Sequence, residues 1–410
     1  MAPDDPARRL PGRAAEPGVA PGDPPPRDEP VTLDNWQGWP WNRWSYQHVS
    51  EIIPCSRVSR GNGPATTLPG DLHDLDGITF TAGDGERLTL AEFLARTCTD
   101  GFLVLHGGRI VAEQYDNGMA PERRHLLQSV SKSITGALAG TLAGRGLLEP
   151  RRKVTHYVPE LRASSFAGAT VRQVLDMTTG TRFSEDYDDP LSDVRRYESA
   201  AGWRPQRDDD CLDLFEYILT LPNHRSHGLQ FEYRSILTDL LGWIIERAGG
   251  LPFADLMSEL LWSPLDPEGD AEITVDRNGH PMTDGGISMT LRDLARFGQM
   301  YLQRGRWHDR QVVPASWVDD TRRATAACRT AFARSESAGR YPRGHYRNQW
   351  WVPDGKAGVL LAAGIYGQFL YLDVPTGVVV AKLSTLPAAL DLDIAADHRR
   401  AFAAIAHTLH

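Results

Sequence analysis

QSVSKSITGALAG, residues 128–140, places Ser129 and Lys132 three positions apart at the start of a run of small and apolar residues. Residues three apart lie on one face of a helix, so the two side chains would be neighbours. A serine hydroxyl becomes a strong nucleophile only when a base takes its proton, and a neutral lysine can be that base. The stretch therefore predicts a buried helix with a serine nucleophile and a lysine base at its start.

Lysine is rare in this chain, with four lysines among the 44 residues that are Lys or Arg. Arginine does not deprotonate in proteins and cannot serve as a base. A lysine in a buried run of so arginine-rich a chain indicates a need for lysine itself, and burial near a positive group would favour its neutral form. S-x-x-K alone is a weak motif, so coincidence stays open as the alternative interpretation.

Two later stretches supply partners for such a pair. FEYRSILTDLLGWI places Tyr233 in a polar turn directly before a helix, where its phenol could shuttle a proton, although most tyrosines simply pack. In LLAAGIYGQFLYLDV, Gly364 and Gly367 interrupt a β-run, which indicates either a bulge or close backbone approach. In the second case the N–H of Ile365, with that of Ser129, could hold a developing oxyanion.

Composition excludes several classes of protein. The chain has 410 residues, 41% of them hydrophobic, and a net charge of −9, so nothing favours nucleic-acid binding. No apolar run reaches the ~18 residues of a membrane helix, and no apolar segment follows the N-terminal arginines as in a secretory signal. We therefore expect a cytoplasmic protein with no membrane partner. Its four cysteines are expected to be reduced; they are Cys55, Cys98, Cys211 and Cys328.

The order of predicted elements indicates one α/β (α+β) domain built from both ends of the chain. Strand-like runs occur at 102–115, around Gly107-Gly108, and as two long runs within 358–384, with mostly helical patterns between. We predict an antiparallel sheet flanked by helices, formed by residues 32–150 and 266–410, with an all-helical insertion at 151–265. Residues 1–31, rich in Pro, Asp and Arg, are predicted to be a disordered tail.

Taken together, the three stretches resemble the serine β-lactamase and penicillin-binding-protein superfamily, whose signature is S-x-x-K, a Tyr or Ser motif and K-T-G on a strand. LLQSVSKSITG, TVRQVLDMTTG, YRSILTDLLGWIIERA and AAGIYGQFLYLD resemble most closely the 6-aminohexanoate-dimer (nylon-oligomer) hydrolases and the class C-like esterase branch. The resemblance extends from about residue 32 to the C-terminus. It implies a β-lactamase-like fold and a serine hydrolase that needs no metal or organic cofactor.

The resemblance also implies roles for individual residues. Ser129 matches the acylated nucleophile, Lys132 its general base, and Tyr233 the residue that passes a proton to the leaving group. The backbone N–H groups of Ser129 and Ile365 match the oxyanion hole. Tyr187 matches a tyrosine that contacts the substrate amide. Further substrate contacts are expected from Ser235, Gly364 and Trp350, the last beside a second tryptophan, Trp351.

Two departures bear on the substrate. Ala362-Ala363-Gly364 stands where the family has K-T-G, so the cation that would grip a β-lactam or peptide carboxylate is absent there. Ser235 replaces the usual Asn and offers fewer donors. The carboxylates around Tyr187 would favour a cationic amine if their loop covers the pocket; they are Glu185, Asp186, Asp188 and Asp189.

The sequence therefore predicts a serine hydrolase that cleaves linear amides or carboxylic esters through an acyl-enzyme, with a small-molecule substrate. A carboxylesterase or transacylase, a D-amino-acid peptidase or β-lactamase on the same machinery, and a non-catalytic binding module stay open as alternatives. The two histidines of HRSH, His224 and His227, lack nearby ligands at zinc spacing, so no metal site is predicted. Whether the chain forms a homodimer stays open.

Overall fold

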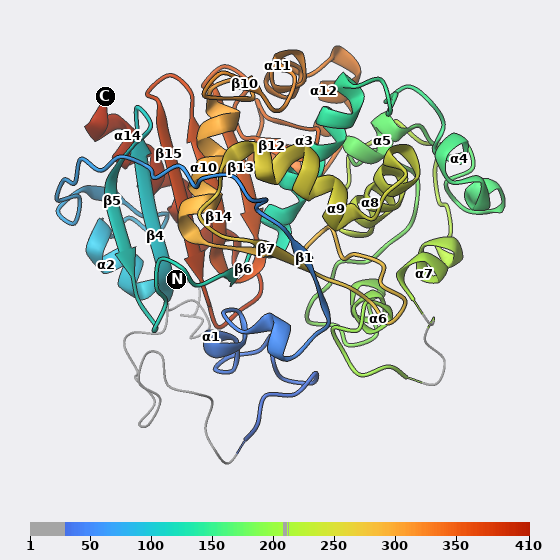
Figure 1. The fold of residues 1–410 in the computed structure, drawn as a ribbon, viewed down its shortest axis with the longest axis horizontal. Helices are drawn as coiled ribbons and strands as arrows, with labels where there is room; N and C mark the ends of the chain where they lie inside the picture. The colour runs from blue at the N-terminus through green and yellow to red at the C-terminus, as the bar shows by residue number, and fades with distance from the viewer. Residues whose placement is uncertain (1–28, 208–210, 212) are drawn as a thin grey trace, which may run out of the picture.

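A seven-stranded antiparallel sheet forms one side of the protein (Figure 1). The structure, a computed structural model, describes residues 29–207, 211 and 213–410, so the predicted tail lies outside the described residues except for residues 29–31. In spatial order the strands are β11 (His345–Arg347), β12 (Trp350–Val352), β13 (Val359–Gly364), β14 (Gln368–Asp373), β15 (Val378–Ser384), β4 (Thr99–His106) and β5 (Arg109–Tyr115). Because β15 pairs with β4, the sheet joins distant parts of the chain, as the sequence predicts.

Helices cover both faces of this sheet, and the strand residues alternate between them. Phe102 and Val104 face the cluster that contains Phe402 of α14 (Leu392–Leu409), with α2 (Leu90–Arg96) beside it. Leu103 and Leu105 face the opposite cluster, which includes α10 (Leu291–Leu302). A sheet buried on both faces explains why its central strands read as almost continuous apolar runs.

The second half of the molecule is mainly helical (Figure 1). Its helices are α3 (Ser131–Gly144), α4 (Val154–Tyr157), α5 (Val171–Leu175), α6 (Asp193–Ala200), α7 (Leu214–Thr220), α8 (Ile236–Gly249) and α9 (Phe253–Met257). A small sheet of β1 (Cys55–Val58), β7 (Ala271–Thr274), β8 (Ile287–Met289) and β6 (His125–Leu126) adjoins it. The remaining α-helices and strands are α1 (Asn42–Ser45), β2 (Thr79–Thr81), β3 (Arg87–Thr89), β9 (Arg306–Trp307), β10 (Arg310–Gln311), α11 (Ala315–Arg323), α12 (Ala326–Ala333) and α13 (Ser337–Arg340). The domain boundaries at 150 and 266 stay a prediction.

Helix α3 lies between the large sheet and the helical half (Figure 1), and its small residues permit that position. A Cβ on Gly136 would lie 2.4 Å from the carbonyl oxygen of Asn348, and one on Gly140 would lie 2.6 Å from the Trp317 ring. Real Cβ atoms do not approach so closely, so glycine lets the backbone of α3 pack directly on its neighbours. The predicted buried helix is confirmed, and this packing fixes the position of the turn before it.

The sequence prediction of two long β-runs within 358–384 is wrong, because the first run is split into β13 and β14. The two strands pair antiparallel, with Gly364 opposite Gln368. Tyr366 (φ 60°) and Gly367 (φ 92°) have left-handed backbone, which makes the tight turn between them. Ile365 therefore stands at the tip of a hairpin instead of inside a strand.

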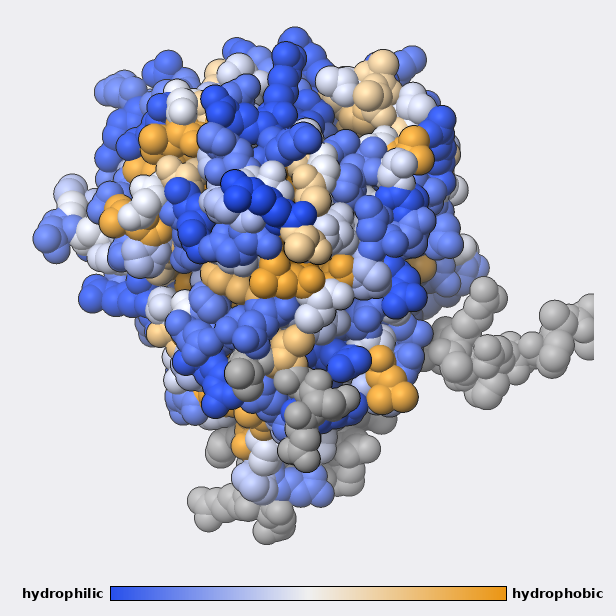
Figure 2. Space-filling model, turned by 90° about the vertical axis from the view of Figure 1, so that its right-hand side faces the viewer, coloured by the Kyte–Doolittle hydropathy of each residue, from blue (hydrophilic) through white to orange (hydrophobic). Residues whose placement is uncertain are grey.

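The molecular face in Figure 2 is largely hydrophilic, with hydrophobic residues in a short band and in scattered groups. Exposed large apolar side chains such as Leu72 and Leu191 are far apart in the sequence, and singly exposed leucines are ordinary in folded proteins. Among the described residues, no helix has both the length and the apolar character needed to cross a membrane.

Candidate active site

Ser129 lies on a strained turn directly before α3. The turn is a short 3₁₀ helix, Gln128–Val130, and Gln128 has a φ of 48°, which non-glycine residues rarely adopt. The Gln128 side chain donates a hydrogen bond of 2.8 Å to the hydroxyl of Tyr46 and is thereby held. Strained backbone of this kind is found where surrounding structure over-determines a functional group, here the position of the Ser129 side chain.

Lys132 reaches back from the first turn of α3 to Ser129. Its Nζ lies 2.8 Å from Ser129 Oγ, and the lysine is 1% exposed. The same nitrogen donates to the backbone carbonyl and to the Oδ2 atom of Asp284, at 3.1 Å each. The pair predicted from S-x-x-K is therefore in direct contact, at a distance suited to proton transfer.

The charge around Lys132 differs from the expectation. Burial lowers its pKa, but the acidic groups around it, with the Asp284 carboxylate first among them, outweigh burial and raise the pKa above its ordinary value. The expected positive neighbour is thus replaced by the Asp284 carboxylate. Lys132 rests as an ammonium ion and must lose a proton before it can act on Ser129.

Tyr233 completes the group from the turn before α8. Its ring centroid is 5.2 Å from Lys132 Nζ, and its side chain hydrogen-bonds to Ser129. Burial raises the pKa of Tyr233, with the Lys132 charge opposing that rise. The phenol is therefore protonated at neutral pH and lies beside both members of the Ser–Lys pair.

The prediction that Trp350 borders the site is wrong, and Trp351 takes that position. Trp350 is 0% exposed and packs against Phe297 and Tyr301 in the core. Trp351 stacks on Tyr233 with ring centroids 5.3 Å apart and planes 21° apart. The two tryptophans are neighbours in β12, and successive strand residues point to opposite faces.

The β13–β14 hairpin brings Gly364 and Ile365 to the nucleophile. A Cβ on Gly364 would lie 2.9 Å from the carbonyl oxygen of Leu127 and 3.0 Å from the backbone nitrogen of Ser129. This contact is close backbone approach, one of the two alternatives left open by the sequence. It places the backbone of residues 364–365 beside the Ser129 N–H, which is the arrangement an oxyanion hole needs.

Ser235 and Glu185 meet at the start of α8. The Ser235 N–H donates to the Glu185 carboxylate, and burial raises the pKa of Glu185. Ser235 is 1% exposed. It therefore holds a loop carboxylate at the start of α8, two residues after Tyr233.

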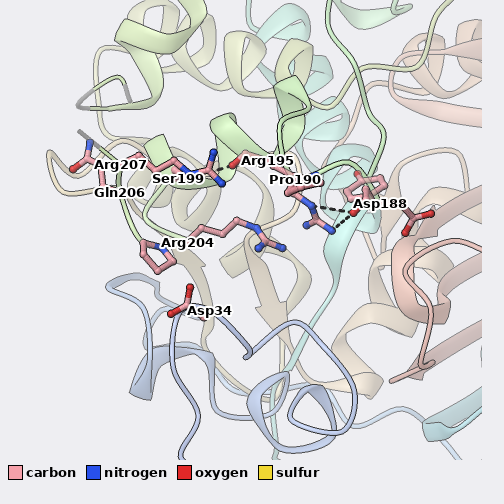
Figure 3. A pocket seen from close by; sticks show the side chains of 10 residues that line it. Asp34, Asp188, Pro190, Arg195, Ser199, Arg204, Gln206 and Arg207 are labelled. Atoms are coloured by element: carbon pink, nitrogen blue, oxygen red, sulfur yellow. Dashed lines mark hydrogen bonds between the residues drawn. The ribbon is translucent and has the colours of Figure 1, made fainter. Parts of the chain in front are cut away.

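A cavity of about 360 Å³ has Tyr187 in its wall, while Ser129, Lys132 and Tyr233 are not among its lining residues. Arg195 stacks over the Tyr187 ring, with its Cζ 5.5 Å from the centroid, and also donates to the Tyr187 carbonyl. Figure 3 shows Arg204 extending across the cavity between Asp34 and Asp188. The cavity thus has both positive and negative side chains in its lining.

The other acidic residues of the Tyr187 loop mostly bind the loop itself. Asp186 Oδ1 accepts hydrogen bonds from the backbone N–H groups of Asp188 and Asp189, and Asp189 Oδ1 accepts one from that of Leu191. Only Asp188 of this set lines the cavity. The hypothesis that all four carboxylates face a substrate amine is therefore reduced to Asp188 and, deeper in the site, Glu185.

Metal-ligating atoms come together elsewhere, at Asp213, Asp276 and His280. Asp276 Oδ2 accepts hydrogen bonds from the Leu214 N–H and from His280 Nδ1, at 3.0 Å each, and Asp213 caps α7. These hydrogen bonds join the loop that contains Asp276 and His280 to the start of α7. His227, set aside as a ligand from the sequence, accepts a hydrogen bond from the Gly180 N–H.

Sequence reasoning missed Asp284, Asp239 and Tyr197, which lie behind Lys132. Asp284 is separated from Lys132 by 152 positions and occurs in the turn MTDGG, residues 282–286. An acidic residue between Thr and two glycines, just before a strand, was the available signal. That pattern predicts a polar turn, but it does not predict which side chain Asp284 contacts.

Comparisons with known proteins agree with this geometry. The family model described as Beta-lactamase matches residues 89–405. A 6-aminohexanoate-dimer hydrolase from Paenarthrobacter ureafaciens is 41% identical over 374 residues, which is 91% of each chain. A solved structure assigned as a 6-aminohexanoate-dimer hydrolase, from Bacillus anthracis, is 28% identical with a TM-score of 0.86 and covers 94% of this chain and 98% of that one. A family VIII carboxylesterase, 13% identical with a TM-score of 0.56, covers 77% and 94% and shares the fold.

Proposed function

Because the chain belongs to the beta-lactamase family and is a serine hydrolase similar to 6-aminohexanoate-dimer hydrolase, we propose that it cleaves linear amides through an acyl-enzyme on Ser129. The observation that carries the proposal is the contact of Lys132 Nζ with Ser129 Oγ at 2.8 Å, next to Tyr233. A non-catalytic binding module has no use for this arrangement.

The proposed reaction has two steps. Neutral Lys132 takes the proton of Ser129 as Oγ bonds to the amide carbon, and the backbone N–H groups of Ser129 and Ile365 stabilise the oxyanion. Tyr233 passes a proton to the leaving nitrogen and takes one from Lys132 in its place, the C–N bond breaks, and an ester to Ser129 remains with Lys132 neutral again. Water then attacks that ester and gives a proton to Lys132, and this proton returns to Ser129 Oγ as the C–O bond breaks and the acid leaves.

The substrate we propose is a short linear amide of an amino acid with separated amine and carboxylate ends. The 41% identical relative is named for the 6-aminohexanoate dimer, which is a molecule of that class. The cavity beside Tyr187 supports it, because carboxylates (Asp34, Asp188) and guanidinium groups (Arg195, Arg204) lie in one lining. On β13, Ala362 and Ala363 precede Gly364 and offer no cation for a β-lactam carboxylate.

Hydrolysis of a defined amide panel tests the proposal. We expect release of free amino acid from the 6-aminohexanoate dimer, with slower turnover of its N-acetyl and methyl ester derivatives, each lacking one terminal charge. A chromogenic cephalosporin and D-peptides should be poor substrates.

The matched variants for that assay are Ser129→Ala and Ser384→Ala, since Ser384 also contacts a buried lysine. Ser129→Ala should abolish turnover and Ser384→Ala should retain it. Equal turnover by wild type and Ser129→Ala would contradict the mechanism, while cephalosporin turnover above amide turnover would contradict the substrate class.

A further inference from the structure

The hydroxyl of Tyr197, on α6, lies between two buried carboxyl groups. It is 2.5 Å from Asp239 Oδ2 and 2.6 Å from Asp284 Oδ1. The three side chains come from α6, α8 and the turn before β8, and all are at most 5% exposed. Through its other oxygen, Asp284 contacts Lys132, so the arrangement continues to the nucleophile.

The hydrogen bonds in this arrangement can be counted. A tyrosine hydroxyl has one proton and can donate to only one of the two carboxyl oxygens. If both carboxyls were ionised, the one that receives no proton from Tyr197 would lie at hydrogen-bonding distance from the hydroxyl oxygen with no hydrogen atom between the two oxygens. Two like charges so close in a buried site cannot both persist, so one carboxyl retains a proton.

Asp239 is the carboxyl that retains it. Asp284 Oδ2 forms an ion pair with Lys132 Nζ at 3.1 Å, and Asp239 has no such cationic partner within the described residues. Asp239 is 1% exposed, and its Oδ1 accepts from the backbone N–H of Thr283 at 2.6 Å, which leaves Oδ2 to carry the proton toward Tyr197. Burial, and then the neighbouring Asp284 carboxylate, raise the pKa of Asp239 well above its ordinary range.

We propose that Asp239, Tyr197 and Asp284 form a chain that holds one proton, so that the pair of carboxyls places one negative charge, not two, behind Lys132. Asp239 donates to Tyr197, Tyr197 donates to Asp284 Oδ1, and Asp284 Oδ2 accepts from Lys132. All three are positioning residues for the reaction proposed above, on whose assignment of Lys132 as the base this inference rests.

Asp284 also fixes the direction of the lysine nitrogen. Its carbonyl oxygen and Oδ2 accept two of the hydrogens on Nζ, and Ser129 Oγ occupies the third direction at 2.8 Å. When the third proton is lost, the two remaining N–H bonds stay on Asp284 and the lone pair faces the serine hydroxyl. One negative charge instead of two behind the nitrogen lets that loss occur at lower pH.

The charged and titratable groups around this chain come from several elements. Those that face Lys132 or the two carboxyls are Tyr197 on α6, Tyr233 and Asp239 at α8, Glu185 and Tyr187 in the loop before α6, and Asp284 before β8. Because all the others remain when one of the two aspartates is replaced by Asn, a change in the pH profile reports the charge of the aspartate that was replaced.

The pH profile of acylation, measured with a p-nitrophenyl ester, tests the charge assignment. Asp284→Asn removes the counterion, so the acid limb should move to lower pH by about one unit or more. Asp239→Asn replaces a group that is already uncharged, so the limb should stay within about 0.3 unit. A downward shift of a full unit in Asp239→Asn, or no shift in Asp284→Asn, would overturn the proposal.

Infrared spectroscopy tests the retained proton without turnover, in the Ser129→Ala background. A protonated-carboxyl C=O band should be present at neutral pH, should move when aspartate is ¹³C-labelled, and should vanish in Asp239→Asn. An absent band, or a band that survives in Asp239→Asn, would overturn the proposal even if the hydrolase activity is as proposed.

Should Asp239→Asn fail to fold, Tyr197→Phe replaces it in that experiment. It removes the acceptor of the carboxyl proton, so the band should change frequency. An unchanged band would overturn the proposal. If wild type does not hydrolyse the ester, the proposed function is contradicted, while the infrared band still tests the proton on Asp239.

Discussion

The protein contains two buried Ser–Lys pairs, and their difference shows what makes a catalytic base. Lys132 donates to Ser129 at the start of α3, and Lys382 donates to Ser384 within β15. Both lysines are at most 1% exposed. By contact and burial alone the two pairs are equivalent.

Their electrostatic surroundings are opposite. Burial lowers the pKa of Lys382 to about 7, against weak opposition from Cys98 and Asp100. At Lys132 the Asp284 carboxylate and the acidic groups near it outweigh burial and raise the pKa. If a depressed pKa identified the catalytic lysine, the choice would fall on Lys382.

The accessibility of the two serines to a substrate favours Lys132 instead. Ser384 is 0% exposed, and its backbone N–H is bound by the Gln368 side chain inside the sheet. Ser129 lies 9% exposed at a strained turn, next to Tyr233 and the β13–β14 hairpin. A reactive Ser–Lys pair therefore needs room for an acyl group and donors for its oxyanion, and a readily deprotonated lysine does not replace them.

The largest effect is expected from Lys132→Arg. Arginine keeps the positive charge but does not deprotonate, so kcat/KM for a p-nitrophenyl ester should fall about 10²–10⁴-fold. Lys382→Met should stay within about threefold of wild type under the same conditions. A comparable loss of kcat/KM in both variants would contradict the claim that only the Ser129–Lys132 pair is catalytic.

Gly364→Ala should produce the next largest effect. Its Cβ would lie 3.0 Å from the Ser129 nitrogen, so the hairpin must retreat and the second oxyanion donor with it. We expect kcat to fall about 10- to 100-fold with a smaller change in KM. Gly339→Ala, at an exposed position with open space around its Cβ, is a control outside the site, and steady-state kinetics that show equal kcat for both variants would argue against Ile365 as a donor.

Lys382→Met should change how stability depends on pH. Because the pKa of Lys382 is about 7 when folded and ordinary when unfolded, the unfolded chain binds the extra proton between about pH 7 and 10. The free energy of unfolding of wild type should rise there relative to the variant, by up to about 1.4 kcal/mol per pH unit. Urea denaturation at several pH values measures it, and parallel curves would contradict the assignment.

The two tryptophans of β12 give the smallest expected effect on catalysis. Trp351→Phe weakens the stack on Tyr233 and should lower kcat/KM about two- to tenfold with little loss of stability. Trp350→Phe should leave activity nearly intact and cost about 1–3 kcal/mol of unfolding free energy. Kinetics and denaturation of both variants check this, and the reverse pattern would restore Trp350 to the site.

The sequence predicts those parts of the site that are encoded locally. Ser129 and Lys132 are one turn apart on one helix, and Tyr233 and the Gly364 region each lie in a recognisable turn. The scarcity of lysine marks Lys132 as unusual, yet it marks the buried Lys382 and the exposed Lys153 and Lys356 equally, so scarcity alone does not identify the catalytic lysine.

What the sequence could not predict depends on long-range packing. The phase of β12 is fixed by its pairing with β11, and a shift of one residue exchanges Trp350 for Trp351. Asp239, Asp284 and Tyr197 meet only when α6, α8 and the turn before β8 come together, so no local pattern links them. The positive charge of Lys132 in the resting enzyme depends on this long-range packing, because it brings Asp284 to the lysine.

The most direct test of the account is to identify the serine that accepts an acyl-like group. A fluorophosphonate should form one covalent bond, with loss of fluoride, to the reactive hydroxyl, and peptide mass spectrometry then locates it. We predict a single adduct on the peptide that contains Ser129, unchanged in Ser384→Ala and absent in Ser129→Ala. An adduct on Ser384 or any other residue of an active enzyme, with Ser129 unmodified, would contradict the account.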